Sequence, residues 1–268
     1  MPHPLLHTDR RGTWTPSYSL IGIAMITKSL QTMKPTLPAI IQTSIQLMVA
    51  GLAPLAAADL KPDRSVIYKT VEDTKLRLEI FEPEDLKSSD SRSAIVFFFG
   101  GGWNGGTTKQ FYQQAETLSN MGMVALCADY RVKSRNKTTP FECVKDGKSA
   151  IRWVREHAAE LGIDPEKIVA SGGSAGGHVA TCTDLISGYE EKDENPKVSS
   201  RPNATILYNP VLDTTRNGYG AARFEADQQT TLSPCHQVKE GLAPTIVFHG
   251  TKDTTVPFEN AERFTELM

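Results

Sequence analysis

A serine that stands between glycines where a strand meets a helix is the residue of this chain best placed for chemistry. Residues 168–179 read IVASGGSAGGHV: an apolar run, a Gly-x-Ser-x-Gly turn and the start of a helical apolar pattern. Gly172 and Gly176 have no Cβ, so the backbone can turn sharply there and neighbouring elements can approach closely. A strand, a sharp turn and a helix are the context in which this motif holds a nucleophile. We therefore predict that Ser174 is a nucleophile.

A phosphate-binding loop is the alternative for the same glycine-rich turn. No Gly-Lys-Ser/Thr follows the turn, and its spacing is not Gly-x-Gly-x-x-Gly. Phosphate and dinucleotide loops use these two patterns to bring backbone N–H groups to an anion. The sequence therefore favours a nucleophile over a phosphate site.

A second glycine-rich segment lies upstream of the serine. Residues 95–99 are continuously apolar, which predicts a strand buried on both faces. Gly100–Gly102 follow directly, and residues without side chains let backbone N–H groups approach a ligand. A glycine loop after a strand is one source of the N–H groups that stabilise an oxyanion beside a nucleophilic serine.

A third motif follows an apolar run at residues 245–249, where a loop carries Asp253 and then Val-Pro. The three motifs, in this order, resemble those of α/β-hydrolase esterases of the hormone-sensitive-lipase type. The chain is similar as well to secreted bacterial esterase/lipase and feruloyl- or acetylxylan-esterase-like proteins. The resemblance extends from the glycine loop to the loop of Asp253.

The resemblance implies roles for residues in all three motifs. In the family, the His-Gly-x-x-Asp-x-x-Val-Pro pattern holds the acid of the catalytic triad, which is Asp253 here. The oxyanion hole would consist of the backbone N–H groups of Gly101, Gly102 and Ala175. The chain departs from the family at Phe99, where the glycine loop often begins with histidine.

Two aspartates compete for the role of the acid, because both follow expected strands. Asp213 lies just beyond the strand expected at residues 204–208, and Asp253 lies beyond the next one. The order of nucleophile then acid fits the chain order Ser, Asp/Glu, His of this fold for either aspartate. The motif around Asp253 decides in its favour.

The family's triad also needs a histidine downstream of the acid, and no histidine follows His249 in the 268 residues. The resemblance therefore predicts that the last strand, the histidine loop and the closing helix lie beyond Met268. A shortened gene model and a defective hydrolase are the two explanations. We assign none of the available histidines as the base. They are expected to pack under the site (His178), fix the acid loop (His249), lie on the surface (His157) or lie in a loop as the only outside candidate (His236).

The remaining pattern predicts an α/β-hydrolase fold at residues 59–268, with a mostly parallel central sheet flanked by helices and with its C-terminal strand and helix missing. Residues 214–242 are the least regular and are expected to form a short lid or substrate-side insert. Strands are expected at 66–71, 76–81, 95–99, 123–128, 168–171, 204–208 and 245–249, and helices at 111–121, 150–161, after Ser174 and at 258–268, the last with Ala261, Phe264 and Leu267 on one face.

The N-terminal region reads as a targeting segment. Residues 33–58 combine a basic start, an apolar stretch and small residues before Asp59, which is typical of a secretory signal peptide. The stretch is too short and too polar for a stable membrane span. Residues 1–32 are an upstream extension or a misassigned start. We therefore expect a secreted or periplasmic protein. A disordered or membrane-anchoring tail, or a cytoplasmic hydrolase with an N-terminal extension, are the alternatives.

Composition narrows the partners. The formal charge of −2 gives no reason to expect nucleic acid or an anionic membrane. No spacing of cysteine and histidine suggests zinc, and no cofactor is expected.

Among the four cysteines, Cys127 and Cys182 are expected in the core, which leaves Cys143 with Cys235 as the one pair worth testing as a disulfide. Residues 190–194 are expected to be a solvated loop.

These observations predict a serine carboxylic-ester hydrolase for small or polysaccharide-linked esters. A serine peptidase of the prolyl-oligopeptidase type shares the serine turn and the acid loop, but no propeller-sized N-terminal domain is present and the glycine triplet favours esters. A catalytically defective module is the third hypothesis. Acyl and alcohol specificity, disulfide pairing and oligomeric state are not readable from the sequence.

Overall fold

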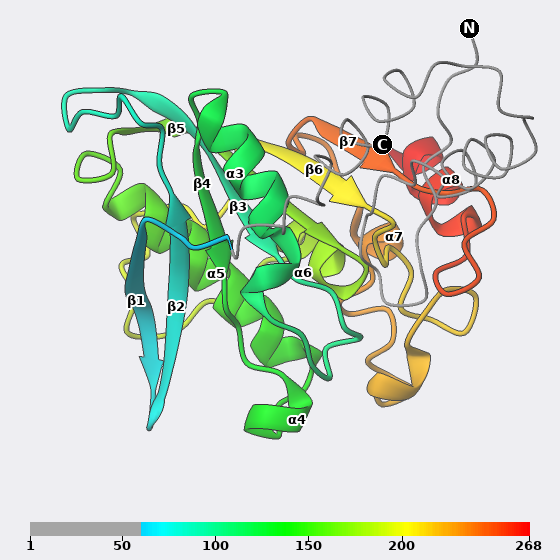
Figure 1. The fold of residues 1–268 in the computed structure, drawn as a ribbon. Coiled ribbons are helices and arrows are strands. Elements are labelled where there is room, and N and C mark those ends of the chain that lie inside the picture. The colour runs from blue at the N-terminus through cyan, green and yellow to red at the C-terminus, as the bar shows by residue number, and fades with distance from the viewer. Residues whose placement is uncertain (1–59) are drawn as a thin grey trace, which may run out of the picture. The chain divides into compact units, whose positions relative to one another are not determined.

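Seven strands form one mixed sheet in residues 60–268, the part of the chain that the computed structural model describes. Their order is β1-β2-β4-β3-β5-β6-β7 (Figure 1). The pairs β1–β2 and β2–β4 are antiparallel, and all other neighbours are parallel. The strands are β1 (Arg64–Val71), β2 (Thr74–Phe81), β3 (Arg92–Phe98), β4 (Val124–Ala128), β5 (Ile163–Gly173), β6 (Ala204–Tyr208) and β7 (Thr245–Phe248).

Helices cover both faces of the sheet, with α3 on one side and α5 and α6 on the other (Figure 1). Strand β3 shows why the sheet must be covered twice: Ile95 and Phe97 pack in the core under α3, and Val96 and Phe98 pack in the larger core on the opposite face. The helices are α3 (Tyr112–Asn120), α4 (Lys133–Asn136), α5 (Pro140–Glu156), α6 (Ala175–Leu185), α7 (Pro234–Gln237) and α8 (Glu259–Leu267), with short 3₁₀ turns η1 (Thr108–Phe111) and η2 (Ala221–Arg223).

The strands lie in all seven predicted ranges, with ends shifted by a few residues. The helix predicted at residues 150–161 is α5, which begins ten residues earlier than predicted and ends at Glu156. Thr139 caps its first turn in a box with Glu142, whose Oε2 accepts a hydrogen bond from the Thr139 N–H at 2.8 Å. Of the three residues predicted to share one face of the last helix, Ala261 and Phe264 are buried and Leu267 is 45% exposed.

All four cysteines are buried and free, so the Cys143–Cys235 pair, the one worth testing, is not a disulfide. The Cys143 thiol donates to the carbonyl of Arg131 at 3.1 Å, and the Cys235 thiol lies near the carbonyl of Asn260. Each sulfur thus sits in its own part of the core. Cys127 and Cys182 are core residues, as predicted.

The charged segment 190–194 does more than the predicted solvated loop would. Glu190 accepts hydrogen bonds from Lys148 and Arg152, two buried side chains of α5. Glu194 pairs with the same Arg152, and Glu191 pairs with Lys69 at 2.8 Å. A buried cation without a partner is costly, so these glutamates compensate the buried charges of Lys148 and Arg152 on α5 and of Lys69 on β1.

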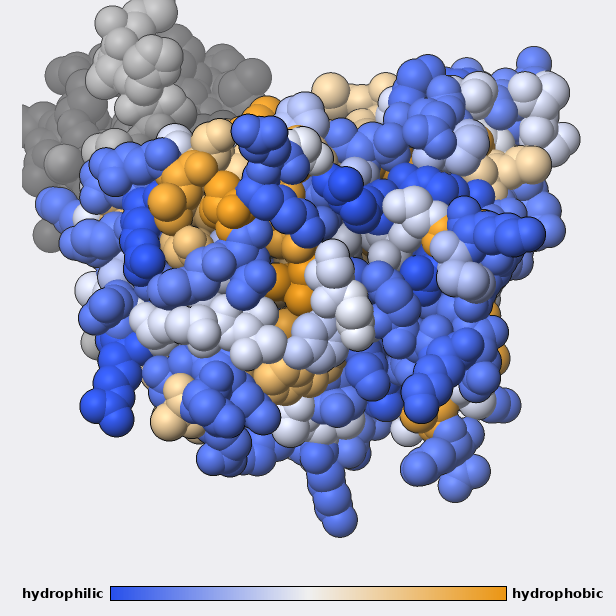
Figure 2. Space-filling view, turned by 180° about the vertical axis from the view of Figure 1, so that it is seen from behind, coloured by the Kyte–Doolittle hydropathy of each residue, from blue (hydrophilic) through white to orange (hydrophobic). Residues whose placement is uncertain are grey.

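The outer surface is largely polar on the face turned away from the viewer of Figure 1, with small apolar areas between polar side chains (Figure 2). None of the helices described for residues 60–268 has both the length and the apolar character of a membrane span. No cluster of His, Cys, Asp and Glu in the same residues is arranged to hold a metal ion. The predicted signal peptide and the extension before it lie outside the described residues, so export stays a prediction.

Candidate active site

The carboxyl ends of the parallel strands bring the predicted motifs to one edge of the sheet. Gly100–Gly102 follow β3, Ser174 follows β5, and the loop of Asp253 follows β7. In open α/β sheets, ligands bind at this edge. The fold thus brings three motifs that are far apart in the chain together in one candidate site.

Ser174 occupies a strained turn at the end of β5. Its φ of 53° and ψ of −120° are rare for a residue with a side chain. Its N–H donates to the carbonyl of Tyr208 at 3.0 Å, and its own carbonyl accepts from the N–H groups of His178 and Val211, both at 3.1 Å. These bonds hold the turn while the side chain points outward. In the segment 170–186, Ser174 is the one residue that is not buried.

Residues 172 and 176 must be glycine, because the backbone atoms of neighbouring segments lie too close to admit a side chain. A Cβ on Gly172 would lie 2.5 Å from the carbonyl carbon of Gly176, and a Cβ on Gly176 would overlap the carbonyl oxygens of Phe98 and Phe99. The helix α6 can therefore pack directly against the end of β3 only with glycine at these positions. This contact brings the loop after β3 next to the serine.

We expect Gly176→Ala to lower the free energy of unfolding by about 3 kcal/mol, because backbone atoms must shift to admit the methyl group. Gly250→Ala is the matched control, since nothing lies within 4 Å of a Cβ at that position. Urea unfolding of both variants measures the difference. Equal stability of the two variants would contradict the close packing of α6 on β3.

The loop after β3 lies against the serine, and its anchor differs from that of the family. A Cβ on Gly100 would lie 3.3 Å from the Ser174 Cβ. Phe99, which stands where the family often has histidine, is buried and stacks on Tyr130 with ring centroids 4.1 Å apart. The Tyr130 hydroxyl donates to the Phe99 carbonyl at 2.5 Å, and Gln110 accepts from the Gly100 N–H at 2.5 Å. Aromatic stacking and two hydrogen bonds therefore fix this loop without a histidine.

Three backbone donors of the site are unused. The N–H groups of Gly101, Gly102 and Ala175 have no acceptor within residues 60–268. Ala175 is the first residue of α6, where the helix leaves its N–H groups without internal partners. Gly101 and Gly102 have φ of 133° and 61°, which a glycine adopts without strain. These are the three donors that the sequence predicted for an oxyanion hole.

His178 is a structural residue of the site. Its Nδ1 accepts a hydrogen bond from the Trp103 indole N–H at 3.2 Å, so its proton is assigned to Nε2, which donates to the Leu232 carbonyl at 2.7 Å. The side chain is buried, and burial lowers its pKa from 6.5 to about 4. With both nitrogens bonded, His178 joins the glycine loop, α6 and the segment before α7. It packs under the site, as predicted.

The buried neutral imidazole predicts a loss of stability in acid. Between pH 6.5 and about 4 the unfolded chain binds a proton at His178 that the folded chain does not, so stability falls as the pH is lowered through this window. The full contribution is about 3 kcal/mol. Urea unfolding at pH 7 and pH 4.5 should show a smaller loss for His178→Gln than for the wild type. Equal losses would contradict this role of His178.

Asp253 lies in a loop that orders one of its oxygens and leaves the other available. Its Oδ1 accepts from the N–H groups of Thr255 and Val256 at 2.8 and 3.0 Å. Its Oδ2 lies 3.5 Å from Nε2 of His249, which is closer to the Val256 carbonyl, at 2.9 Å. His249 thus fixes the acid loop, as predicted.

Asp213, the competing acid, has no oxygen to spare. Its Oδ2 pairs with Arg263 at 2.6 Å, and its Oδ1 accepts from the Thr215 N–H at 2.9 Å. The other histidines are also engaged elsewhere: His157 stacks on Trp153, and His236 bonds to Ser233. Within residues 60–268, no histidine has a hydrogen bond to the Ser174 side chain.

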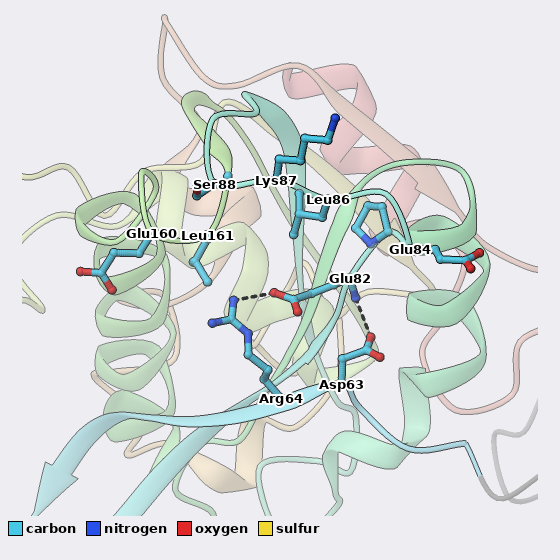
Figure 3. Close-up of a pocket in the computed structure, with 11 residues that line it drawn as sticks. Asp63, Arg64, Glu82, Glu84, Leu86, Lys87, Ser88, Glu160 and Leu161 are labelled. Carbon is cyan, nitrogen blue, oxygen red and sulfur yellow. Dashed lines mark hydrogen bonds and ion pairs between the residues drawn. The ribbon is translucent and has the colours of Figure 1, made fainter.

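A cavity of about 480 Å³ lies elsewhere, between the start of β1, the segment after β2 and the segment before β5 (Figure 3). These segments meet at the amino ends of the parallel strands, opposite to Ser174. Arg64 pairs there with Glu82, whose N–H donates to Asp63 at 2.8 Å. None of the predicted site residues lines this cavity.

A serine in a strained strand–helix turn, beside a glycine loop with free N–H groups, defines an α/β-hydrolase. The BD-FAE family matches residues 78–224 of this chain, which therefore belongs to it. The match includes the glycine loop and Ser174.

Solved structures of esterase 2 from Thermogutta terrifontis share the fold. The apo form superposes with a TM-score of 0.74 at 50% identity and covers 78% of this chain and 80% of that chain. The form phosphorylated by paraoxon gives a TM-score of 0.71 at 51% identity, with 76% of each chain covered.

Curated relatives carry esterase names as well. The probable carboxylic ester hydrolase LipM of Mycobacterium tuberculosis is 28% identical over 71% of this chain and 48% of its own length. The acetylxylan esterase of Xylanibacter ruminicola is 30% identical over 62% of this chain and 32% of its own length. The chain thus spans about half the length, or less, of these two relatives.

No pattern in the sequence indicated the residues that hold the site in place from outside its three motifs. Gln110, which anchors the glycine loop, and Trp103, which bonds to His178, stand in segments without a periodic pattern. The hydrogen bond of Tyr130 to Phe99 likewise had no signal in the sequence. The ion pair that engages Asp213 also depends on a distant residue, Arg263, which no pattern around Asp213 indicates.

Proposed function

We propose that the protein is a serine carboxylic-ester hydrolase with Ser174 as its nucleophile. The observation that carries the proposal is the position of Ser174, half-buried in a strained turn beside a loop whose Gly101 and Gly102 N–H groups have no acceptor in the described residues. A preformed pair of donors beside a nucleophile suits a reaction in which a carbonyl oxygen becomes negatively charged. The membership of the BD-FAE family supports the same chemistry.

In the proposed reaction, the Ser174 Oγ attacks the ester carbonyl while its proton passes to a histidine. The carbonyl oxygen of the tetrahedral intermediate receives hydrogen bonds from Gly101, Gly102 and Ala175. Loss of one such donor costs about 2.7–4 kcal/mol in known enzymes. The histidine then gives its proton to the departing alcohol, and water hydrolyses the acyl-enzyme by the same steps.

The proposed acid is Asp253, which would orient that histidine through its Oδ2. The Oδ1 is held by two backbone N–H groups, so the carboxylate plane is fixed and the second oxygen remains for an imidazole N–H. Because no histidine in residues 60–268 bonds to Ser174, we propose that the base comes from a part of the protein outside these residues.

Small esters are the proposed substrates. Structures of Thermogutta terrifontis esterase 2 hold propionate and butyrate, the acids that short esters would release. The acetylxylan esterase among the relatives supports an acetyl group on a polysaccharide as a second class. Both classes present a short acyl chain to the serine.

The proposal is tested with the full-length protein on p-nitrophenyl butyrate and on a prolyl p-nitroanilide. We expect hydrolysis of the ester and none of the anilide. Anilide hydrolysis would favour the prolyl-oligopeptidase type. No turnover of either substrate, without labelling by a fluorophosphonate probe, would favour a defective module.

A further inference from the structure

Tyr219 lies in a tight turn between β6 and η2, in the segment 214–242 that was expected to form a short lid or substrate-side insert. A Cβ on Gly218 would lie 2.7 Å from Oδ1 of Asn260, and a Cβ on Gly220 would lie 2.5 Å from the ring of Trp103. Both neighbours of Tyr219 are therefore pressed against other parts of the molecule. The turn has little freedom to place this side chain elsewhere.

Hydrogen bonds to Asp213 hold the same turn in place. The Tyr219 N–H donates to the Asp213 carbonyl at 2.9 Å, and the Thr215 N–H donates to its Oδ1. Asp213 itself is buried and held by Arg263 and by the side chain of Asn260. The aspartate that competed for the role of triad acid thus serves as the support of Tyr219.

The hydroxyl of Tyr219 points at the glycine loop. A Cβ on Gly102 would lie 3.3 Å from the Tyr219 Oη. The ring lies beside Trp103, the next residue of that loop, with centroids 6.2 Å apart. Within residues 60–268 the hydroxyl has no hydrogen-bond partner, and neither has the Gly102 N–H. The unused hydroxyl therefore lies against the backbone of Gly102, two residues after the glycine whose Cβ position is 3.3 Å from the Ser174 Cβ.

We propose that the Tyr219 hydroxyl is a further donor of the oxyanion hole. The hydroxyl and the Gly102 N–H both donate hydrogen bonds to the carbonyl oxygen of the substrate. The inference rests on the proposed function, since it requires an ester carbonyl at Ser174. A phenolic O–H is a good donor to a developing oxyanion, and the rigid turn presents it without reorganisation. The hydrogen bond strengthens as the oxygen gains charge, so it contributes to kcat more than to substrate binding.

Tyr219→Phe tests the inference because it removes the hydroxyl and keeps the ring beside Trp103. We expect kcat and kcat/KM on p-nitrophenyl butyrate to fall about tenfold with KM unchanged. Tyr189→Phe is the matched control: it makes the same chemical change at a ring that packs on Phe141, and it should leave kcat at the wild-type value. Thermal unfolding of both variants reports any loss of stability.

The outcomes separate the inference from the proposed function. A wild-type protein that is labelled at Ser174 by a fluorophosphonate, with Tyr219→Phe within twofold of its kcat, overturns the role of Tyr219 alone. An equal loss of kcat in both tyrosine variants, or a loss that follows the melting temperature, overturns it too. A wild-type protein that is neither labelled nor active overturns the proposed function, and the inference with it.

Discussion

Replacing Ser174 with alanine is expected to lower kcat for ester hydrolysis by about 10⁴-fold or more, with a folded protein and little change in KM. Removal of the nucleophile of a triad leaves only the rate that substrate binding and the oxyanion donors supply. The side chain of Ser174 makes no hydrogen bond within residues 60–268, so its removal leaves no partner unsatisfied. Steady-state kinetics of the full-length protein measure the loss.

Ser171→Ala is the control for this experiment, because Ser171 lies three residues earlier in β5 and its hydroxyl donates to the Ile206 carbonyl at 2.6 Å. We expect this variant to lose some stability and to keep its reaction with a fluorophosphonate probe. Mass spectrometry of the labelled wild type should place the adduct on Ser174. An adduct on another serine, or unchanged turnover by Ser174→Ala, would show that the nucleophile lies elsewhere.

The backbone of the site could be predicted because short stretches of sequence determine it. Gly172 and Gly176 are needed where a Cβ would meet backbone atoms, and Gly101 and Gly102 adopt positive φ beside a buried strand. These constraints act within a few residues of the serine and of β3. A motif can report them, because the residues that cause the geometry are those that form it.

The supports of the site could not be predicted because they join residues far apart in the chain. The bond between Trp103 and His178 spans 75 positions, and that between His178 and Leu232 spans 54. The contact of Tyr219 with Gly102 depends on a turn without helical or strand periodicity. Glu190, likewise, gains its role from Lys148 in α5. Sequence patterns describe faces of elements, and they carry no information on which irregular segments meet.

The choice between the two aspartates shows how the structure adds to the sequence argument. The motif around Asp253 indicated the acid, and Asp213 remained a competitor at the end of the preceding strand. In the structure, Oδ2 of Asp213 pairs with Arg263 and its Oδ1 accepts a hydrogen bond from the Thr215 N–H. In Asp253, only Oδ1 is held by backbone N–H groups. An acid that orients an imidazole needs a free oxygen beside the base.

Asp253→Asn is therefore expected to lower kcat by about 10⁴-fold, because an amide in place of the carboxylate favours the wrong tautomer of the proposed histidine. The amide oxygen can still accept the two backbone N–H bonds of Oδ1, so the loop should keep its structure. Asp213→Asn is the matched variant. It weakens the pair with Arg263 and should lower stability while kcat falls far less. The reverse pattern, with kcat lost in Asp213→Asn and kept in Asp253→Asn, would transfer the role of the acid to Asp213.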